Sequence, residues 1–273
     1  MKILFYLPAL LSAILLTLSY LPFSFGALIY VALVPVLWSL GRCRTAKESA
    51  TLMGVCGAVF FAATLFWFTK VFGVFAVSLY FLLALVWSVF GYFYFVLKQK
   101  SKLWLVPVLW TGLEFFRSEV WYFDFPWMTL GLSHHSDFSF SALQSASLWG
   151  IYGTGCIIFI INQCLQESLS NGAARKRIVC AMSALLLACA LVPAVSRYER
   201  ACAAKINSGP SIKVLLVQSE DYTLDELERL TTQSKFSGGL ILWPEYQVPI
   251  LPGERLRAEI FRRMSDIAKN ANS

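Results

Sequence analysis

The charge-free apolar stretches of this chain constrain its fold more than any other feature. Runs without Asp, Glu, Lys or Arg cover residues 3–41, 49–69, 71–97, 103–113, 138–166 and 178–196. A helix that crosses a bilayer needs about 20 predominantly apolar residues. The chain is 58% hydrophobic and only 14% charged. These runs therefore predict a polytopic α-helical membrane domain over residues 1–197.

The number of crossings follows from the basic residues between the runs. The first run is long enough for two helices, near 3–20 and 26–41, because Pro22 and Gly26 favour a turn between them. The run 103–113 is short for a membrane-spanning helix. If it nevertheless spans, the basic clusters at 98–102 and 175–177 lie on the same side of the membrane as Lys2 and the basic residues of 42–47. If it does not span, the two clusters lie on opposite sides. The positive-inside rule then predicts about seven helices, a cytoplasmic N-terminus and an outer location for residues after about 197.

Composition also bears on other classes of protein. The net charge of +7 comes from short basic clusters between apolar runs, which indicates topology signals and argues against nucleic-acid binding. Five of the seven cysteines, at positions 56, 156, 164, 180 and 189, lie inside apolar runs, where cysteine behaves as a small hydrophobe. With no CxxC or His-rich spacing, the sequence predicts no metal and no cofactor.

The last quarter of the chain has the composition of a soluble α/β segment. A linker over 198–211 is followed by two short apolar strand runs, 212–218 and 239–243. Thr223 and Glu226 form a capping box that opens a helix between the strands. Apolar residues at helical spacing predict a second helix that runs to about Lys269. The order is β-α-β-α over 212–273, which is too short to bury a convincing core alone.

Glu245 is the first candidate for chemistry. It stands directly after the second strand run, where α/β folds place active-site groups. Beside Trp243 and Pro244 its carboxylate is expected to be partly desolvated, which would raise its pKa toward the range of a general base. A solvated loop glutamate is the alternative interpretation, and sequence chemistry alone leaves it open.

Several motifs together resemble the apolipoprotein N-acyltransferases, a membrane-anchored family related to the nitrilases (carbon-nitrogen hydrolases). Besides Trp243-Pro244-Glu245 they are Trp110-x3-Glu114-x2-Arg117, Phe125-Pro126-Trp127, Leu130-Gly131, Gly150-x-x-Gly153 and Val217-Gln218. The resemblance implies that 212–273 is a truncated α/β nitrilase-like segment. Asp124 stands where the family has a glycine before Phe125-Pro126-Trp127, and Tyr246 where a small hydroxyl residue is usual.

The membrane motifs also have a physical interpretation. Glu114 and Arg117 lie three residues apart, so they share a helix face and can pair. Because a charge at a helix centre costs about 2.5 to 3.5 kcal/mol on insertion scales, both are expected near the membrane edge or facing the bundle. A structural pair and a substrate contact both remain open. Phe125, Pro126 and Trp127 are interpreted as an interfacial anchor or a lipid-substrate contact, and His134 and His135 as interfacial polar residues.

The resemblance implies a reaction. In the family a Glu-Lys-Cys triad moves a fatty acyl chain from a phospholipid to the N-terminal amine of a diacylated lipoprotein, through a cysteine thioester. Only the glutamate maps to this sequence, as Glu245, because the lysine and cysteine of the family come from later strands.

Three hypotheses follow from the sequence. The first is the N-terminal part of such an acyltransferase in a bacterial cytoplasmic membrane, inactive alone or completed by a C-terminal chain. The second is a non-catalytic membrane scaffold, whose unpaired strand edges would need a partner. The third is a nitrilase-type amidase for soluble substrates, which would not require seven spans.

Overall fold

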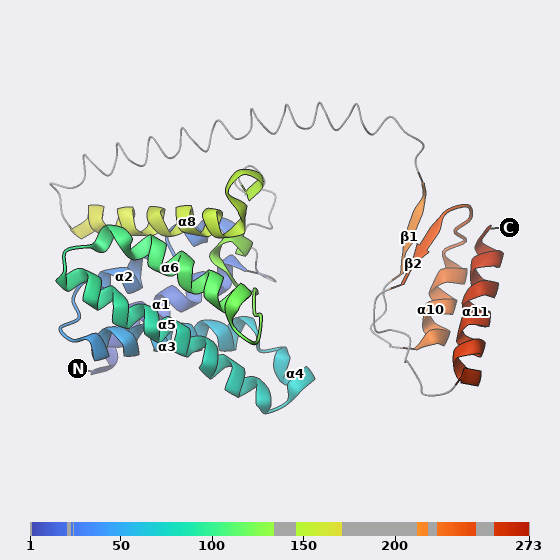
Figure 1. Cartoon of the computed structure of the whole chain (residues 1–273), viewed down its shortest axis with the longest axis horizontal. Coiled ribbons are helices and arrows are strands. Elements are labelled where there is room, and N and C mark those ends of the chain that lie inside the picture. Colours follow the sequence, from blue (N-terminus) through green and yellow to red (C-terminus); the bar gives the residue numbers. More distant parts are fainter. Residues whose placement is uncertain are drawn as a thin grey trace. The chain divides into compact units, whose positions relative to one another are not determined.

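The computed structural model describes residues 2–20, 23, 25–133, 146–170, 212–217, 223–243 and 254–272. The chain divides into two compact units, Met1–Ala201 and Cys202–Ser273 (Figure 1). The domain boundaries predicted at 197 and 211, and the helix predicted near 178–196, lie outside the described residues.

The regular elements in the described part of the first unit are all helices (Figure 1). Its elements are α1 (Lys2–Ser19), the 3-10 helix η1 (Gly26–Tyr30), α2 (Val34–Leu40), α3 (Ala46–Thr64), α4 (Phe68–Phe72), α5 (Phe75–Gln99), the 3-10 helix η2 (Leu103–Leu105), α6 (Val106–Phe115), the π-helix η3 (Phe116–Val120), the 3-10 helix η4 (Leu130–Ser133) and α8 (Ala146–Ser170). Helices are therefore present in every apolar run that the structure describes, although their ends differ from the predicted ones.

Helices α3 and α5 form the most extensive pairing of the unit. Small residues allow the two backbones to approach closely: a Cβ on Gly91 would lie 2.4 Å from the carbonyl oxygen of Ser49. The hydroxyl of Ser49 donates a hydrogen bond to the Gly91 carbonyl oxygen at 2.6 Å. Farther along this helix pair Phe60 stacks on Trp87, and Trp87 packs edge-on against Trp110. Close packing of small residues with a polar crosslink is the usual way for helices to associate in a membrane.

The helical stretch predicted near 26–41 is present, but it consists of two segments, η1 and α2, with a turn between them. Residues 31–33 form a turn between η1 and α2, and Pro35 lies in the first turn of α2, where its missing N–H costs nothing. The side chain of Asn162 in α8 satisfies the backbone at the break. Its Oδ1 accepts from the Leu33 N–H at 2.9 Å and its Nδ2 donates to the Ile29 carbonyl oxygen at 2.8 Å.

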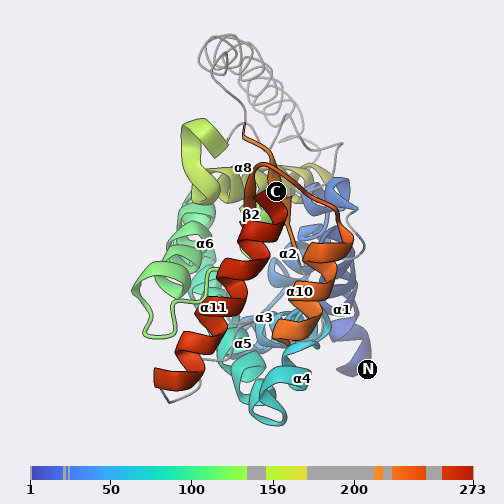
Figure 2. The same ribbon diagram turned by 90° about the vertical axis from the view of Figure 1, so that its right-hand side faces the viewer.

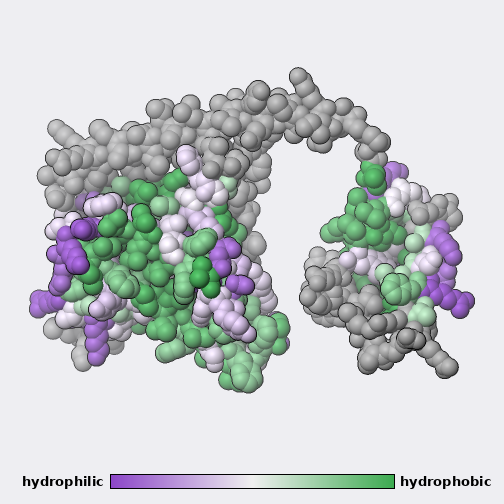
Figure 3. Space-filling model, in the orientation of Figure 1, coloured by the Kyte–Doolittle hydropathy of each residue, from purple (hydrophilic) through white to green (hydrophobic). Residues whose placement is uncertain are grey.

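Among the described residues, α5 is the one helix both long and apolar enough to cross a membrane. The helical stretches Leu4–Ser19 and Gly26–Leu40 are apolar but shorter. Hydrophobic side chains cover the middle of the first unit, and hydrophilic ones gather at the end where the chain passes from α5 toward α6, on the left in Figure 3.

The second unit has the predicted β-α-β-α order in its described residues. Strand β1 (Val214–Leu216) pairs in parallel with β2 (Leu240–Leu242), and the connecting helix α10 (Leu224–Gln233) lies beside α11 (Glu254–Asn272) (Figures 1 and 2). The Thr223 hydroxyl accepts from the Glu226 N–H at 3.4 Å, as the capping box predicts.

The sheet of the second unit has one open face. Leu215 and Ile241 are half-buried, and Leu227 of α10 and Ile267 of α11 are buried. The neighbouring residues of both strands point to the opposite face of the sheet and are exposed, namely Val214, Leu216, Leu240 and Leu242. A parallel sheet normally has both faces covered.

Candidate functional site

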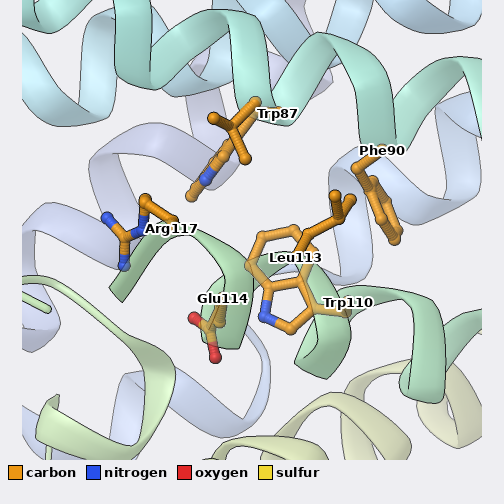
Figure 4. A pocket seen from close by; sticks show the side chains of 7 residues that line it. Trp87, Phe90, Trp110, Leu113, Glu114 and Arg117 are labelled. Atoms are coloured by element: carbon orange, nitrogen blue, oxygen red, sulfur yellow. The ribbon is translucent and has the colours of Figure 1, made fainter. Parts of the chain in front are cut away.

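The region around Glu114 and Arg117 is the most unusual part of the first unit, because it places polar side chains inside an apolar bundle. Helix α6 begins with Val106-Pro107, and Trp110 and Glu114 lie one turn apart on its buried face. Arg117 follows in η3. Glu114 is 6% exposed and Arg117 2%. The two side chains and the indole of Trp110 are shown in Figure 4.

Glu114 connects α6 to two other elements. Its Oε1 accepts a hydrogen bond from the Leu130 N–H at 2.9 Å, at the start of η4. Its Oε2 lies against α8 at Gly155, where a Cβ would be 3.1 Å from that oxygen. A glycine at 155 therefore leaves room for the carboxylate between the two helices.

The predicted ion pair between Glu114 and Arg117 is absent. None of the ion pairs between described residues joins them. Arg117 lies in the π-helical turn η3, in which the Trp121 N–H bonds to the carbonyl oxygen of Phe116 five residues earlier. The guanidinium of Arg117 instead lies over the ring of Phe61 in α3, 5.6 Å from its centroid.

Several buried polar atoms in this region have no hydrogen-bond partner. They are Trp110 Nε1, Glu114 Oε2, Arg117 Nη1, Ser118 Oγ and Thr129 Oγ1. A small cavity lies beside them, lined by aromatic and aliphatic side chains of α5 and α6 together with Glu114 and Arg117 (Figure 4). Ionisable groups that face the interior of a membrane bundle commonly mark functional positions.

The predicted Phe125-Pro126-Trp127 motif packs next to this cluster. The Phe125 N–H donates to the Arg117 carbonyl oxygen at 3.2 Å, and the Phe125 side chain is buried. Trp127 is 41% exposed and stacks on Trp67, with 5.6 Å between ring centroids. Pro126 is exposed. The structure thus brings Glu114, Arg117 and this motif together on one side of the unit.

Asp124, where the family has glycine, has a backbone φ of 38°. This is the left-handed region, which glycine adopts freely and which aspartate tolerates better than most residues. The replacement therefore keeps the turn that aims Phe125 into the bundle.

Three polar contacts of this region were not predicted from the sequence. The Tyr20 hydroxyl donates to the Thr129 carbonyl oxygen at 2.8 Å, across 109 residues of sequence. The Tyr152 hydroxyl hydrogen-bonds Glu119. Asn162 bridges the break between η1 and α2. Only Asn162 carried a signal, since an amide inside an otherwise apolar run must find buried partners.

The candidate residues of the second unit are described only in part. The Trp243 indole Nε1 donates to the Thr231 Oγ1 at 3.1 Å, and Thr231 is buried on α10. This bond fixes the chain directly after β2. Pro244, Glu245, Tyr246, His134 and His135 lie outside the described residues.

Together these features define a predominantly helical protein with a buried polar cluster at α6 and η3 and a small parallel α/β unit near its end. The family model of the apolipoprotein N-acyltransferase N-terminal domain matches residues 12–164, which is more than half of the chain. The chain belongs to the apolipoprotein N-acyltransferase family.

Three curated relatives agree with this assignment, and each is named apolipoprotein N-acyltransferase. The relative from Geobacter metallireducens is 26% identical over 89% of this chain and 51% of its own length. The one from Coxiella burnetii is 25% identical over 89% and 54%. The one from Pasteurella multocida is 27% identical over 92% and 52%. The chain spans about half the length of the curated relatives it matches.

Proposed function

We propose that the chain crosses a bacterial cytoplasmic membrane about seven times, with its N-terminus in the cytoplasm and Glu245 on the outer side. The position of the basic loops supports this topology. The Lys98 Nζ donates to the Cys43 carbonyl oxygen at 3.0 Å, so the basic loop after α2 and the basic end of α5 lie at the same end of the unit. The positive-inside rule assigns that end to the cytoplasm.

The proposed reaction is the transfer of a fatty acyl chain from a phospholipid to the N-terminal amine of a diacylated lipoprotein. A cysteine thiolate attacks the ester carbonyl of the phospholipid and forms a thioester as the lysophospholipid alcohol leaves. The amine of the lipoprotein then attacks the thioester, which forms the amide and returns the thiol. Glu245 is the proposed base that takes the proton from each nucleophile in turn and returns it to the leaving group, first the lysophospholipid alkoxide and then the cysteine thiolate. No residue of these 273 is assigned as the cysteine nucleophile or as the lysine that steadies the oxyanion.

The extent of the similarity carries this proposal. The curated relatives align with 89% to 92% of the chain, so the similarity is not confined to apolar helices, whose composition alone produces chance likeness. The Trp243 indole is anchored to Thr231 directly after β2, and α/β folds favour active-site groups close after a buried strand, which supports the role proposed for Glu245.

We assign a structural role to the buried polar residues Glu114 and Arg117 of the first unit. The contacts of Glu114, Arg117 and Phe125 all join α6 and η3 to neighbouring elements of the bundle. Trp127 is the residue of the motif that is aromatic, exposed and stacked on Trp67, so we assign Trp127 and Pro126 to the membrane interface.

An acyl-transfer assay tests the function. The 273 residues are expressed alone and together with the C-terminal half of one relative, and transfer from phospholipid to a diacylated lipopeptide is measured. We expect no turnover by the 273 residues alone, turnover by the pair, and its loss in Glu245→Gln but not in the control Glu226→Gln, which changes a half-buried carboxylate of α10. Robust turnover by the 273 residues alone would contradict the proposal that the cysteine nucleophile is not among them.

A second candidate is a non-catalytic scaffold that binds another polypeptide. The open sheet face formed by Val214, Leu216, Leu240 and Leu242 favours it, because exposed apolar strand residues of this kind commonly pack on a partner. In the same co-expression, a stable complex between the two halves without any acyl transfer would support the scaffold over the enzyme.

A further inference from the structure

A cavity of about 360 Å³ opens at the basic end of the first unit. It lies where α2 ends at Gly41, α5 ends beside Lys98, η2 begins at Leu103 and α8 presents Glu167. It is separate from the polar cluster of Glu114 and Arg117, with which it shares no lining residue.

The chain segments that border this cavity carry more basic than acidic residues. Lys98 lines it and uses one of its three N–H donors on the Cys43 carbonyl oxygen. Arg42, Lys100 and Lys102 are exposed neighbours in sequence of its lining residues. The one carboxylate in the lining, Glu167, accepts a hydrogen bond from the Gln163 Nε2 at 2.9 Å. The balance favours an anionic ligand over a cation.

The level of the cavity relative to the proposed membrane indicates that the anion belongs to a lipid headgroup. Helix α5 is suited to cross a membrane, so its last turn at Lys98 lies where hydrocarbon meets water. Two exposed tryptophans lie at the same end of the unit. Trp104, next to Leu103, is 70% exposed, and the guanidinium of Arg42 lies 3.2 Å from the ring centroid of Trp38. Tryptophan and arginine in this arrangement are typical of the headgroup layer.

We propose that this cavity binds the phosphate of an anionic phospholipid headgroup, with Lys98 as the contacting cation. Basic pockets between transmembrane helices on the cytoplasmic side bind such headgroups in other membrane proteins. The proposal rests on the membrane placement proposed above and is independent of acyl transfer.

Binding of phosphatidylglycerol to the full chain in phosphatidylcholine nanodiscs tests the proposal. Native mass spectrometry or a fluorescent lipid reports the affinity. Lys98→Gln is expected to weaken phosphatidylglycerol binding about fivefold, since a juxtamembrane cation contributes about 1 kcal/mol toward an anionic lipid. Lys47→Gln removes the same charge from the same end of the unit but lies outside the cavity, and it is expected to change binding less than about twofold.

A variant that fills the cavity separates the site from general attraction. Gly41 has a helical φ of −56°, and a Cβ there would approach the Trp38 and Leu37 carbonyl oxygens to 3.4 and 3.7 Å, so the backbone accepts a side chain at this lining position, which Gly41→Leu supplies. It keeps every charge and is expected to lower phosphatidylglycerol binding at least as much as Lys98→Gln.

Three outcomes would overturn the proposal. Equal losses in Lys98→Gln and Lys47→Gln would show attraction without a site, and unchanged binding in Gly41→Leu would place the lipid elsewhere. Competition by soluble glycerol phosphate at the lipid's own concentration would show that the bilayer is not required. A chain that does not insert into membranes would instead contradict the topology proposed for the protein.

Discussion

The carboxylate of Glu114 accepts a hydrogen bond from the backbone N–H of Leu130 at 2.9 Å, inside a helix bundle where both groups are buried. The bond joins α6 to η4 and so fixes the end of the segment that contains Phe125 and Trp127. It gives Glu114 a structural partner that is a backbone amide and not Arg117.

Replacement of Glu114 by alanine is expected to destabilise the first unit by about 1 to 3 kcal/mol, because it leaves the Leu130 N–H buried without an acceptor. Glu114→Gln keeps an oxygen at the same place and is expected to cost less than half as much. Thermal unfolding in detergent, followed by tryptophan fluorescence, measures both. If the two variants melt together, the bond to Leu130 does not carry the stability assigned to it.

Asn162 is predicted to be a strong determinant of stability. Asn162→Leu keeps the branched shape of the side chain but removes the partners of the Leu33 N–H and the Ile29 carbonyl oxygen at the break between η1 and α2. We expect a loss of about 2 kcal/mol or more in the same unfolding assay. Gln166→Leu, on the same helix with its amide bonded only to Ser170, is the matched control and is expected to cost less than about 0.5 kcal/mol. A small effect at Asn162 would mean that the break is satisfied in another way.

Gly131 and Gly112 are expected to respond in opposite ways to replacement by alanine, because only Gly131 is in close contact with another backbone. A Cβ on Gly131 would lie 2.2 Å from the Ile151 carbonyl oxygen, so Gly131→Ala is expected to cost about 1 to 3 kcal/mol through forced backbone movement. A Cβ on Gly112 in α6 meets nothing within 4 Å, so Gly112→Ala is expected to stabilise by about 0.5 to 1 kcal/mol. Opposite shifts in melting temperature are the predicted result, and a stabilising Gly131→Ala would refute the close approach of η4 and α8.

Asp124 offers a test of the backbone ahead of the aromatic motif. Its φ of 38° suits glycine, so Asp124→Gly is expected to be neutral or to stabilise by up to about 1 kcal/mol, while Asp124→Val is expected to destabilise by about 1 to 2 kcal/mol. Unfolding of both variants measures the difference. A stabilising valine would show that the turn is not left-handed.

Much of the fold was predictable because it depends on local pattern. The charge-free runs predicted the helices of the first unit, and Thr223 with Glu226 predicted the start of α10. The contacts that individual side chains make within the bundle were not predictable in the same way. The spacing of Glu114 and Arg117 predicted a pair, whereas the Glu114 carboxylate accepts from the Leu130 N–H and the Arg117 guanidinium lies over the ring of Phe61.

The polar connections of the bundle were the least predictable part. The bond from Asn162 to Leu33 spans 129 residues, and that from Tyr20 to Thr129 spans 109. Such partners are chosen by the packing of whole helices, about which the spacing of residues in one helix says nothing. The role of Glu245 stays a prediction, because that residue lies outside the described part of the chain.

A reporter fusion after Ser273 tests most directly the claim that Glu245 lies on the outer side of the membrane with the lipid substrates. Alkaline phosphatase is active only outside the cytoplasm, whereas green fluorescent protein fluoresces at this position only if it remains inside. An odd number of crossings predicts an active phosphatase fusion and a dark fluorescent one. An inactive phosphatase with a fluorescent partner fusion would contradict the count of about seven helices and the proposed site of acyl transfer.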